Sequence, residues 1–191
     1  MESPDKNKPL EKGAGAPPHH LPIPPTPLIG RQNEVAAAAD LLLREEVRFL
    51  TLTGPPGIGK TRLAIEIANR LLTKFAHGIY FVNLASIADS HLVLPTIAHT
   101  LSLRQGKDRS LIAELKDLLL SRHVLLLLDN FEQVIQAAPA LTDLLQATRH
   151  LKLLITSREV LRVSGEHIFP VPTLPLPPVL VDQRVPRVWA S

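Results

Sequence analysis

The sequence predicts an α/β protein built in three layers, α/β/α, around a five-stranded, mainly parallel sheet. Strand-like and helix-like segments alternate along most of the chain, and this order builds a parallel sheet with helices on both faces. The unbroken apolar run 124–128, VLLLL, is typical of a strand that is buried on both faces. With 191 residues, 45% of them hydrophobic, the chain is also long enough to form a domain with its own core.

The five expected strands and the helices between them follow in order. The strands are expected at 47–53, 78–84, 123–128, 151–156 and, at an edge of the sheet, 167–171. The helical patterns cover 60–72, 90–103 and 109–121, and further helical stretches continue to residue 149. In the first helix, apolar side chains recur at helical spacing, at Leu63, Ile65, Ile67, Ala68 and Leu71.

Proline-rich segments bound the expected domain on both sides. The first 27 residues hold eight of the chain's 18 prolines and too few apolar side chains to offset the entropy lost on ordering, so residues 1–27 are expected to be a flexible leader. Residues 170–178, PVPTLPLPP, favour an extended polyproline-like path. The globular domain is therefore expected to span residues 28–171, followed by an extended, proline-rich tail at 172–191.

Composition excludes several classes of function. The chain has no cysteine, which excludes disulfides, cysteine-ligated metal sites and thiol nucleophiles. Its net charge is only +3, its basic residues are scattered and only 4% of its residues are aromatic, so direct binding of DNA or RNA is not expected. The eight histidines show no metal-ligand spacing. No signal sequence and no apolar run of about 20 residues is found, so we expect a cytoplasmic protein without a membrane span.

A phosphate-binding loop is the clearest chemical signal. Residues 54–61, GPPGIGKT, fit the Walker A or P-loop pattern G-x-x-x-x-G-K-[ST], and they lie between an expected strand and an expected helix. Such a loop directs main-chain N–H groups at a phosphate chain, and here the donors should run from Gly57 to Thr61, because proline has no N–H. Lys60 would bind the β- and γ-phosphates, and Thr61 would ligate Mg²⁺. The residues expected to bind nucleotide in this segment are Gly54, Pro55, Pro56, Gly57, Ile58, Gly59, Lys60, Thr61 and Arg62.

Asp129 follows the buried strand directly, as the aspartate of a Walker B strand does. A carboxylate at the carboxyl end of such a strand lies where open α/β sheets bind ligands. It could hold Mg²⁺ through water, opposite Thr61. Alone, the residue could equally cap the next helix; together with the P-loop upstream, it predicts a metal site.

Hydrolysis would require a group that activates water beside the γ-phosphate. Many P-loop ATPases have an acid directly after the Walker B aspartate, but this chain has Asn130 there, and an amide cannot take a proton at neutral pH. Lys60, Asp129 and Glu132 are the candidate catalytic residues. Glu132 is the candidate for activating water, although a glutamate in the first turn of a helix is equally expected for ordinary stability. The sequence therefore predicts binding of nucleotide with weak ATPase activity at most.

Two further segments are candidates for contact with the nucleotide. Arg158, after the fourth strand, could report the presence of a γ-phosphate, because a guanidinium matches phosphate oxygens bidentately; otherwise it pairs with Glu159. The segment Leu28, Ile29, Gly30 and Arg31 precedes the first strand of the core. It could clamp a base, or it could be an ordinary entry into a helix.

Five motifs follow one another along the chain: PLIGRQNE, TLTGPPGIGKTRLA, GIYFVNLA, HVLLLLDNFEQV and LKLLITSREVLRVSGE. Over about residues 27–178, they closely resemble the NB-ARC-like ATPase module of STAND-class proteins, and most of all the module of large bacterial LuxR-type transcriptional regulators. The resemblance implies a P-loop NTPase fold, with residues 28–31 on the adenine side, Asp129 as the Walker B aspartate and Arg158 as the sensor arginine. It also implies a switch: ADP holds a closed state, and exchange for ATP opens the protein for assembly with itself or other modules.

The sequence departs from this family in ways that leave alternatives open. The loop GPPGIGKT is as common in AAA+ ATPases, whereas Asn130 and the segment TSRE favour the STAND class. The family's later helical and winged-helix subdomains, a repeat sensor and a helix-turn-helix segment are not found, so we expect the nucleotide-binding piece of a larger regulator, cut short. The alternatives are an active AAA+-like ATPase and a regulator that binds DNA in its own right.

Overall fold

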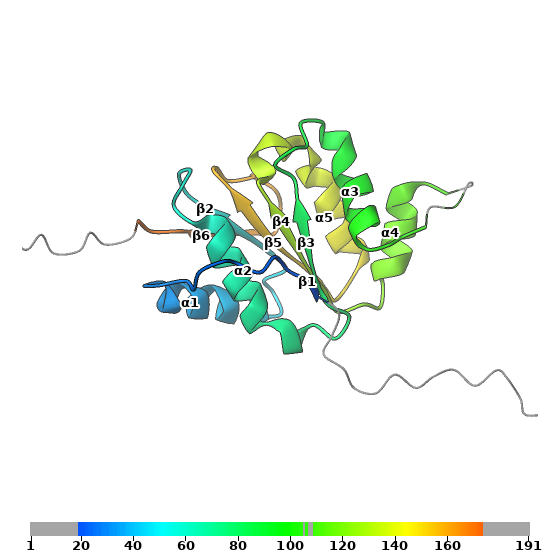
Figure 1. Ribbon diagram of the computed structural model, residues 1–191. Helices are drawn as coiled ribbons and strands as arrows, with labels where there is room; N and C mark the ends of the chain where they lie inside the picture. The colour runs from blue at the N-terminus through cyan, green and yellow to red at the C-terminus, as the bar shows by residue number, and fades with distance from the viewer. Residues whose placement is uncertain (1–18, 105, 107–108, 174–191) are drawn as a thin grey trace, which may run out of the picture.

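Helices cover both faces of a central parallel sheet in the computed structural model, which describes residues 19–104, 106 and 109–173 (Figure 1). The six strands are ordered β1-β3-β4-β5-β2-β6, and every pair of neighbours is parallel. The strands are β1 His19–His20, β2 Phe49–Thr53, β3 Ile79–Asn83, β4 Val124–Asp129, β5 Leu151–Ser157 and β6 Glu166–Pro170. The α-helices are α1 Gln32–Leu43, α2 Lys60–Arg70, α3 Val93–Thr100, α4 Leu111–Leu119 and α5 Ala138–Ala147.

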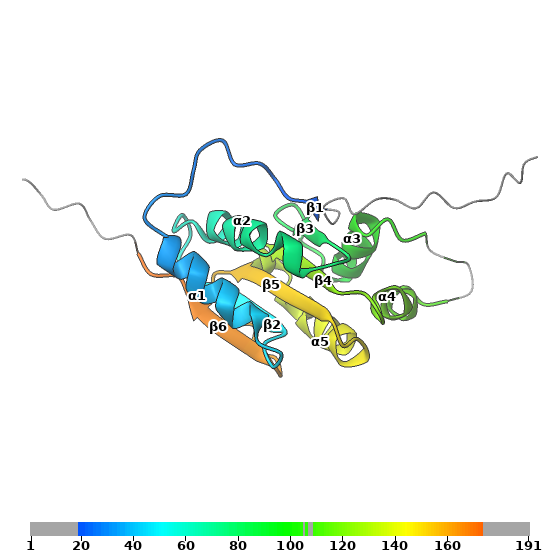
Figure 2. The same ribbon diagram turned by 90° about the horizontal axis from the view of Figure 1, so that it is seen from below.

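The three-layer α/β/α architecture is confirmed. Helices α1 and α2 pack on one face of the sheet, and α3, α4 and α5 pack on the other (Figure 2). Strand β4 lies between these two apolar layers and is buried along its whole length. Its side chains alternate, because successive residues of a strand point to opposite faces: Leu126 and Leu128 join the core under α3–α5, whereas Leu125 and Leu127 join the core under α1 and α2.

The five expected strands are all present, and the expected edge strand is β6, which pairs with β2. The sixth strand, β1, differs from the expectation, because it lies within the segment 1–27 that we expected to be a flexible leader. His19 and His20 pair with Ile79 and Tyr80 of β3. Main-chain pairing needs no alternating pattern of side chains, so no pattern in the sequence indicated this strand. Residues 1–18 and 174–191 lie outside the described part of the chain.

Several expected helices are shorter in the structure. The helical pattern 90–103 begins with a 3₁₀ turn, Ser90–Leu92, before α3, and the pattern 60–72 ends in a 3₁₀ turn, Leu72–Lys74. After β4 the chain forms two further 3₁₀ turns, Phe131–Gln133 and Ile135–Ala137. In the described part of the chain, no helix is both long enough and apolar enough to cross a membrane.

The order of the strands places three loops side by side. Strand β5 lies between β2 and β4, so the segments that follow these three parallel strands meet at one edge of the sheet. The chain leaves β2 toward the helices on one face and leaves β4 toward the helices on the other. Such a switch point, at the carboxyl ends of the strands, is where open α/β sheets bind ligands.

Candidate functional site

The loop between β2 and α2 holds its shape through glycines with positive φ. Gly57 has φ 77° and Gly59 has φ 93°, a region that side chains other than glycine rarely adopt. A Cβ atom on either residue would meet nothing within 4 Å, so the backbone angle, not space, requires glycine. Gly59 precedes α2, and no side chain caps the amino end of that helix. Its first N–H groups are therefore left for another acceptor.

Lys60 begins α2 and turns back over the loop. Its Nζ donates to the carbonyl oxygens of Gly54 at 2.7 Å and Pro55 at 3.0 Å. The pKa of Lys60 lies below its ordinary value, chiefly because burial disfavours the charged ammonium group. The negative charges of Glu132 and Asp129 raise this pKa, and the positive charge of Arg158 lowers it. The ammonium group thus lies within electrostatic reach of all three of these side chains, which come from other elements.

Asp129 ends β4 and accepts hydrogen bonds from two hydroxyl groups. Thr61 of α2 donates to Asp129 Oδ1 at 2.7 Å, and Thr156 of β5 donates to the same oxygen at 2.6 Å. Asp129 is 4% exposed, and it does not cap a helix, since Asn130 stands at that position with φ 64°. A carboxylate beside a hydroxyl supplies the hard oxygen ligands that Mg²⁺ takes. The donor set at Thr61 and Asp129 therefore fits this ion.

Arg158 and Glu132 form an ion pair, with Arg158 Nε 2.9 Å from Glu132 Oε1. This contact differs from the alternative considered above, in which Arg158 pairs with Glu159. The side chain of Glu132 is 11% exposed, whereas that of Arg158 is 56% exposed. The other carboxylate oxygen, Glu132 Oε2, is buried and has no hydrogen-bond partner among the described residues. Glu132 therefore depends on Arg158 for compensation of its charge.

A cavity of about 330 Å³ joins these side chains. The loop, the turn after β4 and the end of β5 line it, through Pro56, Gly57, Gly59, Lys60, Thr61, Arg62, Asn130, Glu132, Thr156 and Arg158. Most were candidates from the sequence, but Thr156 was not identified as the partner of Asp129. Its position near the end of the strand beside the P-loop strand was the signal from which this contact could have been predicted.

Arg31 fixes the entering segment against the loop. It is buried, donates to the carbonyl oxygens of Pro172 at 2.6 Å and Ile58 at 3.3 Å, and pairs with Glu34 at 3.3 Å. A second cavity of about 330 Å³ lies on this side of the loop, lined by Arg31, Pro55, Pro56, Gly57, Ile58 and Thr173. Arg31 is therefore the member of the 28–31 segment that the structure brings to the P-loop.

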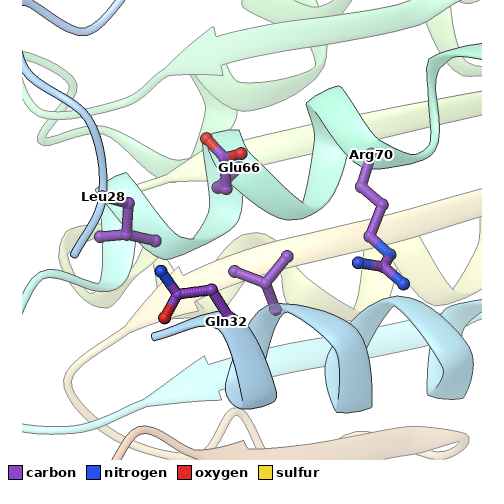
Figure 3. A pocket seen from close by; sticks show the side chains of 5 residues that line it. Leu28, Gln32, Glu66 and Arg70 are labelled. Carbon is purple, nitrogen blue, oxygen red and sulfur yellow. The ribbon is translucent and has the colours of Figure 1, made fainter. Parts of the chain in front are cut away.

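The other residues of the expected adenine-side segment lie elsewhere. Leu28 faces a separate cavity of about 250 Å³ between α1 and α2, which Gln32, Glu66 and Arg70 also line. Figure 3 shows Leu28 close to Gln32, with Arg70 at the opposite end of the cavity. Ile29 is 77% exposed, and Gly30 has φ 72°. The apolar clamp predicted from Leu28 and Ile29 is thus not assembled beside the phosphate-binding loop.

Arg62 links the loop to the segment that runs from β1 to α1. It lines the first cavity, and its guanidinium donates to both the carbonyl and the hydroxyl oxygen of Thr26. Leu21 and Leu28 of the same segment pack on the core under α1 and α2. Figure 2 shows this dark blue segment crossing over α2.

Comparisons with known proteins agree with this architecture. The sequence profile of the NB-ARC domain matches residues 31–170. A Mycobacterium bovis protein named "Putative HTH-type transcriptional regulator" is 39% identical over 128 residues, which cover 66% of this chain and 14% of that protein. An uncharacterized protein of Mycobacterium bovis is 33% identical over 163 residues, which cover 85% of this chain and 41% of that protein.

Two solved structures share the fold at low sequence identity. Cdc6p from Pyrobaculum aerophilum has a TM-score of 0.57 and 18% identity, covering 77% of this chain and 46% of that one. Drosophila ORC bound to DNA has a TM-score of 0.59 and 15% identity, covering 75% of this chain and 43% of that one. Both matches concern the arrangement of strands and helices.

Proposed function

This chain belongs to the NB-ARC family, and from that premise we propose that it is the ATP- and ADP-binding switch module of a STAND-type, signal-transducing transcriptional regulator. The observation that carries the proposal is the meeting of Lys60, Thr61 and Asp129 at one edge of the sheet, with Thr61 Oγ1 2.7 Å from Asp129 Oδ1. An ammonium group for phosphates, free N–H groups at a helix start and oxygen ligands for Mg²⁺ are the parts that a nucleoside phosphate requires.

The regulatory part of the proposal rests on the relatives. The chain spans only 14% of the length of a relative that is named as a transcriptional regulator. We therefore propose that assembly with other modules or with itself takes place within such a full-length regulator, and that contact with DNA belongs to parts of it other than this module. Because the module would use ATP and ADP, we place it in the cytoplasm.

We expect hydrolysis of ATP to be slow. Asn130 stands where many P-loop ATPases have an acid, and Glu132 is held by Arg158 at 2.9 Å. P-loop enzymes that lack a stimulating arginine are about 10³–10⁵-fold slower than those supplied with one. Rapid turnover by this chain, abolished by substitution of Asp129 or Glu132, would instead favour an AAA+-like ATPase.

Titration with Mg²⁺ and ADP or ATP tests the proposal by thermal unfolding. Nucleotide at about 100 times its Kd stabilises the folded state by about 2.7 kcal/mol, which raises the Tm of a chain of this length by roughly 5–10 °C. Lys60→Ala should remove this shift. Lys74→Ala, at an exposed lysine after α2, is the matched control and should retain it. An absent shift in the unaltered chain, or an equal shift with Lys60→Ala, would contradict the proposal.

A further inference from the structure

The Glu132–Arg158 ion pair spans the cavity between the turn after β4 and the end of β5. Both side chains line the cavity that Lys60 and Thr61 also line. Glu132 Oε1 lies 2.9 Å from Arg158 Nε, so the guanidinium is engaged by a carboxylate inside the site itself. Arg158 is the more exposed partner, with 56% of its side chain accessible, which leaves it free to turn, whereas the Glu132 side chain is 11% exposed.

The pair is incomplete on the side of Glu132. Its second oxygen, Oε2, is buried without a hydrogen-bond partner among the described residues. A buried carboxylate oxygen without a donor raises the free energy of the folded state, and the attraction to Arg158 and Lys60 offsets part of this cost. Glu132 thus competes strongly for any cation in the cavity.

The γ-phosphate of a bound nucleoside triphosphate would need the same cationic side chains, Arg158 and Lys60, that Glu132 already attracts. Lys60, Glu132 and Arg158 line the same cavity, and Glu132 and Arg158 are in direct contact. A γ-phosphate beside Lys60 would add negative charge next to Glu132 and would attract Arg158. A diphosphate lacks that group, so it leaves the ion pair undisturbed.

We propose that Glu132 determines specificity by holding Arg158 away from the site of the terminal phosphate, so that the ion pair favours a nucleoside diphosphate over a triphosphate. This inference rests on the proposed function. It differs from the role of catalytic base considered for Glu132 in the sequence, because Glu132 Oε1 is already in contact with the guanidinium of Arg158. ATP binds fully only when its γ-phosphate takes Arg158 from Glu132.

The test is the ratio of two dissociation constants, measured by calorimetry with Mg²⁺-ADP and with a non-hydrolysable Mg²⁺-ATP analogue. Glu132→Gln keeps the shape of the side chain but removes its charge, so we expect the ratio to shift about tenfold toward the triphosphate analogue. Glu159→Gln is the matched control: it removes the same charge from the exposed residue next to Arg158, and it should leave the ratio unchanged.

A second variant separates competition for Arg158 from direct repulsion of the phosphate. Arg158→Gln should weaken the triphosphate analogue more than ADP, and adding Glu132→Gln to it should shift the ratio less than about threefold, since no guanidinium remains to be released. An equal gain from Glu132→Gln in both backgrounds would overturn the proposal in favour of direct repulsion.

The remaining outcomes distinguish this inference from the proposed function. If ADP and the analogue both bind and Glu132→Gln leaves their ratio unchanged, the role of Glu132 is refuted while the nucleotide site stands. If Glu132→Gln only slows hydrolysis, Glu132 is a catalytic base and the inference is wrong. If the unaltered chain binds neither nucleotide, both proposals fail.

Discussion

Lys60 and Lys152 lie at opposite ends of the sheet, and both direct their ammonium groups at main-chain carbonyl oxygens. Lys152 donates to the carbonyls of Leu42, Arg44 and Val47 at 2.6, 2.6 and 3.0 Å, which uses all three N–H donors of a lysine. Lys60 donates to two carbonyls of its own loop and keeps one donor. A lysine with satisfied donors holds a structure together, whereas one with a spare donor can bind a ligand.

The same difference holds for the two ends as a whole. At the amino ends of the strands, Arg48 donates to the carbonyls of Leu145, Thr148 and Leu151, joining α5 to β5. Burial lowers the pKa of Arg48. A cavity at this end, lined by Leu43, Glu45, His123, Arg149, His150 and Lys152, has a volume of about 480 Å³ and is larger than the P-loop cavity of about 330 Å³. The proposal of a nucleotide site at the P-loop therefore rests on its free N–H groups and its oxygen ligands, and not on the volume of the cavity.

The largest effect should come from replacing Lys152 by methionine, with the same replacement of Lys60 as the comparison. Lys152→Met leaves three carbonyls without a charged donor and should lower the free energy of unfolding by about 2–3 kcal/mol. Lys60→Met should change that free energy by less than about 0.5 kcal/mol, because the two carbonyls that Lys60 contacts belong to a partly exposed and an exposed residue of the loop, where water can replace the ammonium donor. Urea unfolding without nucleotide measures both. Equal losses of unfolding free energy in Lys152→Met and Lys60→Met would contradict the distinction between a structural lysine at the amino end of the sheet and a ligand-binding lysine at the carboxyl end.

Thr156→Val tests whether the two hydroxyl groups that donate to Asp129, at the carboxyl end of the sheet, have different roles. Asp129 is buried and accepts from Thr156 at 2.6 Å and from Thr61 at 2.7 Å. Loss of the Thr156 hydroxyl should lower the free energy of unfolding by about 1–2 kcal/mol, since it deprives a buried carboxylate of a donor. The matched variant Thr61→Val should mainly abolish the dependence of nucleotide binding on Mg²⁺. Loss of that dependence in Thr156→Val but not in Thr61→Val would reverse our assignment of the two hydroxyls.

The smallest effect concerns pH at the amino end. Burial, followed by the charges of His150, Lys152 and His77, lowers the pKa of His123 below its ordinary value of 6.5. The unfolded chain therefore binds a proton at higher pH than the folded chain, so stability is lost as pH falls through 6.5 toward the folded pKa. The backbone N–H of His123 also donates to His77 Nδ1 at 2.9 Å.

His123→Gln should weaken this dependence on pH. Urea midpoints between pH 7 and pH 5 measure it, with His91→Gln as the control at an exposed histidine of the 3₁₀ turn before α3. A pH dependence that is the same in all three proteins would show that the amino end does not contribute to acid sensitivity.

Local patterns predicted most of the sheet and much of the candidate site. The run 124–128 indicated a buried strand, and the loop 54–61 indicated where phosphates would be held, because each pattern follows from the backbone needs of a short segment. The bond between Thr61 and Asp129 joins residues 68 positions apart. Their proximity was expected only because the strands were expected to be parallel.

Contacts between distant segments could not be predicted in the same way. Arg158 pairs with Glu132 instead of its neighbour Glu159, because the order of the strands places the ends of β4 and β5 side by side. Strand β1 has no pattern of its own and exists through main-chain pairing with β3. The carbonyls that Lys152 binds lie more than 100 positions away, at the end of α1 and the approach to β2.

The sequence by itself determined the α/β class and the five main strands, and it identified the residues proposed to hold a phosphate chain and a magnesium ion, since these depend on periodicity and on local backbone geometry. Only the tertiary structure decided which charges face one another: Glu132 with Arg158 at one end of the sheet, and Lys152 with three carbonyls at the other. The physical reason is that hydrogen bonds and ion pairs act over a few ångströms in space, and distance along the chain does not report that proximity.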